Sequence, residues 1–159
     1  MRNKIKLFAS LLFLMLSFDF QSIAQSDTIP NPESKLIIIK TNYSIEENIK
    51  RLGEVFIDNN FELGDIQKDF GIIKTVGKSM KQNALSKYRI SGRCKSNGDV
   101  ILQVEYRWEK TLTLGGFQDV KGDWKAWEYS RNRKQQEYFN QGIKIAKTLG
   151  SDIHFYSDF

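Results

Sequence analysis

The chain is poor in the residues on which many catalytic and metal sites depend. Its 159 residues include one histidine, one cysteine and two prolines. His154 has no cluster of cysteines or carboxylates around it in the sequence, so we expect no metal site there. No nucleophile lies next to an activating base, as enzyme sites of that kind require. The sequence therefore predicts a protein that is not an enzyme and that carries no cofactor and no metal.

Cys94 has no second cysteine with which to form an internal disulfide. A free cysteine usually packs as a small buried hydrophobe, and this is the preferred interpretation. An intermolecular bridge or a nucleophile are the alternatives, and no neighbouring histidine or acid is placed to activate the thiol.

A strong excess of charge is also absent. The whole chain has a net charge of +5, with 24 basic and 19 acidic residues. Residues 1–24 hold three of the basic residues and one acid, so the remainder carries a net charge of +3. Such a value gives no electrostatic footprint for nucleic acid. The expected partners are an envelope protein or polymer.

Residues 1–24 have the three parts of a secretory signal peptide. Basic residues come first, the apolar run Leu7–Phe18 follows, and Ser22-Ile23-Ala24 fits a cleavage site. The apolar run is too short to span a bilayer comfortably, although an uncleaved anchor is the alternative. We expect export to the periplasm or beyond, a flexible lead-in over residues 25–34, and one domain over residues 35–159. No further transmembrane span is expected after cleavage.

A capped amphipathic helix followed by a hairpin organises the domain. Ser44 and Glu47 form a capping box, and the helix runs to about Asn60. Its apolar stripe consists of Ile45, Ile49, Leu52 and Phe56. Two strands, at residues 61–67 and 72–76, follow around a turn. Residues 36–39 form a short β-branched run that predicts a buried strand before the helix.

A second hairpin has the clearest alternation in the chain. A three-residue loop over 96–98 pairs Cys94 with Val100, whereas a two-residue loop pairs Cys94 with Ile101. Only the first register keeps one face of the hairpin apolar, and it is preferred for that reason. It places Lys87, Arg89 and Arg93 together on the other face.

The remaining segments complete the predicted fold. Residues 77–84 read as a polar loop, residues 110–123 as a long loop or ragged hairpin, and residues 124–129 as a fifth strand. A helix capped by Ser130 and ending at Leu149 follows, and an apolar tail packs back. The sequence therefore predicts an α+β fold with an antiparallel sheet of about five strands, two helices on one face, and β-α-β-β-β-β-α order.

Two groups of residues are candidate binding sites. Trp108, Trp124, Trp127 and Tyr129 form an aromatic neighbourhood, which either fills the core or lines a site for a sugar or an apolar group. Lys87, Arg89 and Arg93 form either an ordinary solvated face or a basic strip for an anionic polymer, a phosphate group or an acidic partner.

The pattern resembles bacterial envelope domains of unknown function that have a TATA-binding-protein-like, or helix-grip, fold. The resemblance is carried by the helix over 44–60 and by the phrase Phe61-Glu62-Leu63 … Asp69-Phe70-Gly71-Ile72-Ile73-Lys74-Thr75. The terminal helix with Phe139, Ile143 and Ala146 also contributes. Lipoproteins of the outer-membrane barrel assembly machinery have a similar helix-then-hairpin phrase. The resemblance implies an antiparallel sheet with both helices on one face, and it implies no DNA binding. The chain lacks the lipid-attachment cysteine of the lipoprotein members.

Three functional hypotheses follow. The first is an exported, non-enzymatic binding or scaffold module of the cell envelope. The second is a carrier or sensor of a small apolar or sugar ligand held between sheet and helices. The third is an enzyme that would use an acid pair, Glu105 with Glu109 or Asp119 with Asp123, in a cleft that splits their pKa values.

Overall fold

The computed structural model describes residues 28–157 except 82, 120 and 131–132. Its elements in chain order are β1 Leu36–Lys40, α2 Ile45–Asp58, β2 Leu63–Gln67, the 3-10 turn η1 Lys68–Phe70, β3 Ile72–Thr75, β4 Lys78–Met80, β5 Asn83–Cys94, β6 Asp99–Trp108, β7 Lys110–Thr113, β8 Gly116–Asp119, β9 Lys125–Ala126, α3 Arg133–Leu149 and β10 Ile153–Tyr156.

Most strands belong to one antiparallel sheet. Its order is β10-β1-β6-β5-β3-β2, with β4 paired to β5 and β9 paired to β6. The predicted α+β class is confirmed, but the sheet has eight strands rather than about five. Residues 77–84, read as a loop, supply β4 and the start of β5, and the C-terminal tail supplies β10. Strands this short have too few residues to show an alternating pattern.

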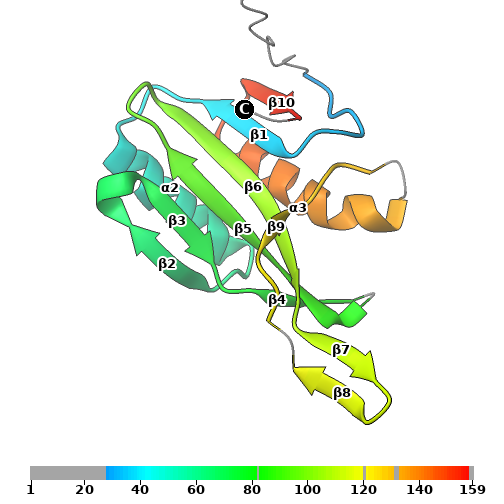
Figure 1. Ribbon diagram of the computed structural model, residues 1–159. Coiled ribbons are helices and arrows are strands. Elements are labelled where there is room, and N and C mark those ends of the chain that lie inside the picture. Colours follow the sequence, from blue (N-terminus) through cyan, green and yellow to red (C-terminus); the bar gives the residue numbers. More distant parts are fainter. Residues whose placement is uncertain (1–27, 82, 120, 131–132, 158–159) are drawn as a thin grey trace, which may run out of the picture.

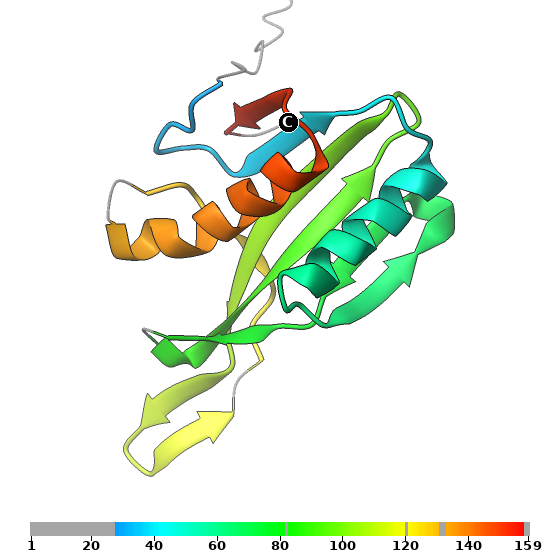
Figure 2. The ribbon, with the colours of Figure 1, turned by 180° about the vertical axis from the view of Figure 1, so that it is seen from behind.

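Both helices cover the same face of the sheet. They lie behind it in Figure 1 and in front of it in Figure 2. α3 packs on β1 and β6, and α2 packs on β3 and β5. The core between them is completely buried at residues such as Phe56, Phe139, Ile37, Leu102 and Val104. The prediction of two helices on one face is confirmed.

Local sequence sets the start and end of α2. The Ser44 hydroxyl accepts a hydrogen bond from the Glu47 amide at 3.2 Å, as the capping box predicts. The helix ends with Asn59 at its C-cap, and Asn60 takes a left-handed conformation with φ of 59°. The helix therefore stops at the two asparagines, because asparagine tolerates the positive φ that Asn60 adopts.

The β5–β6 hairpin has the predicted register. Cys94 pairs with Val100, Ile90 with Val104 and Tyr88 with Tyr106. Gly98 has a φ of +91°, and a Cβ there would lie 2.1 Å from the carbonyl oxygen of Thr41. Both the backbone angle and the close approach therefore require glycine at this turn.

The strands β7 and β8 form a separate hairpin. They pair only with each other in the described part of the chain. The hairpin projects away from the body of the protein in both ribbon views. Residues 110–123 thus contain the ragged hairpin of the two predicted alternatives, and we call residues 110–119 the arm.

The C-terminal tail packs back, as expected. β10 pairs antiparallel with β1, placing Tyr156 beside Leu36 and His154 beside Ile38. Among the described residues, no helix combines the length and the apolar character needed to cross a bilayer.

Candidate binding site on the open face of the sheet

The face of the sheet opposite the helices carries the predicted basic strip. Tyr88, Ile90 and Cys94 point toward the helices, because they belong to the core or pack against it. Side chains alternate along a strand, so Lys87, Arg89 and Arg93 lie on the other face. We call this the open face. No described helix covers it (Figure 1).

Two residues of the strip are already paired with carboxylates. The Lys87 ammonium lies 2.9 Å from Glu109 Oε2, and the Arg89 guanidinium is ion-paired with Glu105. Arg107 binds the other oxygen of Glu109. The hydrogen bond from Lys87, followed by the contribution of Arg107, lowers the pKa of Glu109 despite an opposing effect of burial. Each of these three cations therefore has a carboxylate partner, and Lys87 and Arg107 share Glu109.

Trp124 is held on the open face by cations. Its ring lies 4.2 Å from the Arg89 guanidinium and 4.5 Å from that of Arg107, both measured to the ring centroid. A Cβ on Gly77 would lie 2.7 Å from the edge of this ring, so the glycine makes room for it. The position of Trp124 is therefore explained by its packing against Arg89 and Arg107.

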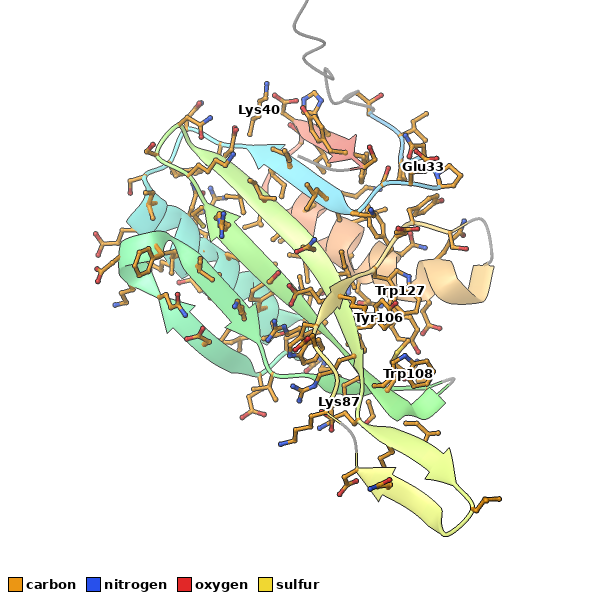
Figure 3. All side chains as sticks on the ribbon, in the orientation of Figure 1. Glu33, Lys40, Lys87, Tyr106, Trp108 and Trp127 are labelled. Atoms are coloured by element: carbon orange, nitrogen blue, oxygen red, sulfur yellow. The ribbon has the colours of Figure 1, made fainter. Side chains whose placement is uncertain are left out.

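Trp127 and Tyr129 belong instead to the helix side of the sheet. The Trp127 ring packs at 5.0 Å from Tyr106 and 5.6 Å from Tyr138, and Tyr129 packs at 5.4 Å from Phe139. Trp108 is 50% exposed and lies apart from Trp127, near the base of the arm in Figure 3. The structure therefore does not bring the four predicted aromatic residues into one site. Trp127 and Tyr129 pack against the core.

A hollow of about 330 Å³ lies in the middle of the open face. Strand register places Lys74 and Arg93 at its border, with Ser91 between them, since Lys74 pairs with Ser91 and Ile72 pairs with Arg93. Apolar side chains of Leu36, Ile72 and Ile101 complete the lining, together with Gln103 and Glu105. Neither Lys74 nor Arg93 has a carboxylate partner among the residues that the structure describes.

Lys74 was not among the predicted site residues. The signal that points to it is the buried Ile73, because alternation then sends Lys74 to the open face. Its position diagonally across from Arg93 depends on the pairing of β3 with β5, which strand patterns alone do not reveal.

The acid pairs of the enzyme hypothesis lie in ion pairs or on the surface. Glu105 and Glu109 are bound to arginine and lysine, and Asp119 lies 3.8 Å from Lys110. The lowered pKa of Glu109 is opposite to what a general acid at neutral pH needs. This geometry does not favour acid–base catalysis.

Cys94 is buried and free, and burial raises the pKa of its thiol to about 11. The thiol is therefore protonated at neutral pH and is shielded from solvent, as a small core side chain would be. Within the described ranges, no three histidine, cysteine, aspartate or glutamate side chains are grouped as a metal site would require.

Comparisons with known proteins assign neither a family nor a function to the chain. The sequence matches no protein-family model, and a search of curated proteins finds no match.

Proposed function

We propose that the protein is an exported, non-enzymatic binding module of the bacterial cell envelope that holds an anionic group in the hollow of the open face. The observation that carries the proposal is the difference between the cations of this face. Lys87, Arg89 and Arg107 have carboxylate partners, whereas Lys74 and Arg93 flank the hollow without one in the described part of the chain.

The chemistry of the lining suits an anion attached to an apolar group. An arginine offers a planar fork of donors that matches a carboxylate or phosphate, and lysine adds a point charge. Leu36 and Ile101, which are only 6% and 5% exposed, already pack in a small cluster with Ile38 and Tyr156. Ile72, which is partly exposed, is the apolar side chain of the lining that a ligand can cover. Burying apolar area of a ligand there contributes about 25 cal/mol per Å².

The cellular location rests on the sequence. The predicted signal peptide over residues 1–24 and the resemblance to envelope domains both support export. Envelope molecules that join phosphate or carboxylate groups to apolar chains are then the class of ligand that this hollow would meet.

The test is a titration of the purified protein with octyl phosphate and with octanoate, followed by NMR of isoleucine methyl groups. Octyl glucoside, which has the same chain and no charge, is the control ligand. We expect the methyl signals of Ile72 and Ile101, which line the hollow, to shift with the anionic ligands.

Variants separate charge from apolar contact. Arg93→Gln and Lys74→Gln should each weaken binding about tenfold, because each removes a charge-assisted hydrogen bond. Lys144→Gln, on the exposed side of α3, should leave it unchanged. Equal binding of octyl glucoside, or no effect of Arg93→Gln, would overturn the proposal.

A further inference from the structure

The helix layer does not reach across the whole sheet. Packed helices lie about 8–10 Å apart and neighbouring strands about 4.8 Å apart, so two helices cover about four strands. α3 packs on β1 and β6, whereas α2 packs mainly on β3 and β5 and only slightly on β2. The outer strand β2 extends past α2 on that side, and Figure 2 shows α2 running alongside this edge.

A groove of about 820 Å³ follows this edge, between α2 and β2. Its apolar lining comes from both elements and from β3, and consists of Ile45, Ile49, Ile57, Leu63, Ile66 and Ile73. Ile57 is 57% exposed and Ile66 is 41% exposed. These two side chains are left exposed to solvent along this edge of the helix layer.

The border of the groove is acidic. Glu46, Glu47, Glu54 and Asp69 line it, against Lys50 and Lys68. Over residues 44–71 there are seven acidic and three basic side chains, in a chain whose net charge is +5. An apolar groove bordered by acids is complementary to an amphipathic segment with basic flanks.

The edge of β2 is a poor template for a further strand. The pairing of β2 with β3 shifts register between Leu63 and Ile66, and such irregularities protect natural edge strands from pairing. α2 itself has 14 residues and is therefore about 21 Å long. The groove beside it accommodates about three to four turns of a helix.

A second copy of the chain offers no suitable helix. The apolar stripes of α2 and α3 are both buried on their own sheet, at residues such as Leu52, Phe56, Phe139 and Ala146. We propose that the groove between α2 and β2 docks an amphipathic helix of a partner protein, with aliphatic residues in the groove and lysine or arginine residues toward Glu46, Glu54 and Asp69.

The first experiment titrates the purified protein with a synthetic amphipathic helix of about 18 residues that has leucine on one face and lysine on the other. The comparison peptide replaces each lysine by glutamate. We expect the isoleucine methyl signals of Ile57 and Ile66 to shift, and those of Ile72 and Ile101 to stay. The affinity for the glutamate peptide should be lower by about tenfold or more, because the acidic border repels it.

A matched pair of variants tests the location. Ile66→Lys places a cation in the groove and should weaken the lysine peptide about tenfold. Val76→Lys makes the same change at a side chain that is also 41% exposed and lies outside the groove lining, and it should have no effect. Circular dichroism of both variants checks that the fold is retained.

Three results would overturn the proposal. They are unshifted Ile57 and Ile66 signals at saturating peptide, equal affinity for the two peptides, and a dimer in sedimentation that Ile66→Lys dissociates. The third result would assign the groove to a second copy. Because the groove and the hollow lie on opposite sides of the sheet and report through different isoleucine methyls, either proposal fails without affecting the other.

Discussion

Tyr138 buries its ring between Tyr88 and Trp127, yet its hydroxyl has no hydrogen-bond partner among the described residues. A buried polar group without a partner costs about 1–3 kcal/mol of stability. The Tyr138 hydroxyl therefore lowers the stability of the fold, and a single substitution that removes it measures the effect directly.

Replacing Tyr138 by phenylalanine should raise the free energy of unfolding by about 1 kcal/mol, since the orphaned hydroxyl is removed and the ring is kept. Tyr129→Phe is the matched control. Its hydroxyl accepts a hydrogen bond from Gln136 Nε2 at 3.2 Å, so its loss should lower stability. Urea unfolding measures the change in the free energy of unfolding of each variant. A loss of stability in Tyr138→Phe would contradict the explanation.

Glu109 makes the stability of the folded protein depend on pH. Its pKa is lowered in the folded state, chiefly by the hydrogen bond from Lys87, so the carboxylate stabilises the fold above its unfolded pKa of about 4.3. This contribution is lost as the pH falls through the lower, folded value. Urea unfolding at neutral and at acidic pH should show a smaller difference in Glu109→Gln than in the wild type.

The matched control for that experiment is Glu33→Gln, because Glu33 is exposed, lies outside every helix and has no ion pair within the described residues. It should keep the wild-type pH dependence. If both variants behave alike, the cluster around Glu109 does not stabilise the fold.

At the scale of elements, the two helices hold their glycines for different reasons. A Cβ on Gly53 would lie 3.5 Å from Ile73 and 3.7 Å from Leu63, which is ordinary contact. A Cβ on Gly142 would lie 3.0 Å from both Ile37 and Val104. The sheet therefore approaches Gly53 but leaves room for a methyl group, whereas the contact at Gly142 of α3 is tighter.

Gly53→Ala should therefore raise the free energy of unfolding by about 0.5–1 kcal/mol, the helix-propensity difference between the two residues. Gly142→Ala should lower it by about 1 kcal/mol, because crowding in a packed core outweighs the same gain. Thermal or urea unfolding of the pair decides the matter. A gain in both variants would show that α3 moves easily away from the sheet.

At the scale of the whole molecule, the body and the arm differ in their attachment. Both helices and the large sheet share one continuous core, while β7 and β8 pair only with each other among the described residues. Surface charge is divided as well, with acids around the α2–β2 groove and cations on the open face. The proposed binding surfaces therefore lie on opposite faces of the same sheet.

Shortening the arm should leave the body intact. Lys110 pairs with Asp119, so a two-residue Asn-Gly turn can replace residues 111–118 and close the hairpin directly. We expect the melting temperature to stay within about 4 °C, since less than about 1 kcal/mol of body packing is removed. A larger fall measured by calorimetry would show that the arm is part of the cooperative core.

Local patterns sufficed for much of the fold. The capping box of α2, the parity of the β5–β6 hairpin and the apolar stripe of α3 each predicted what the structure contains. They also placed Lys87, Arg89 and Arg93 on one face. The short strands β4, β9 and β10 were missed or misplaced, because two to four residues stabilised by a neighbouring strand have no periodic signal of their own.

The sequence by itself determined the α+β class, the helix stripes and the hairpin register, because these depend on contacts between residues close along the chain. Only the tertiary structure decided which cations have carboxylate partners, that Trp124 and Trp127 lie on opposite faces, and that Lys74 lies diagonally across from Arg93. Those facts depend on strand order and on side chains that meet across long loops. Residues distant in the chain become neighbours through the free energy of the whole core, which no local pattern contains.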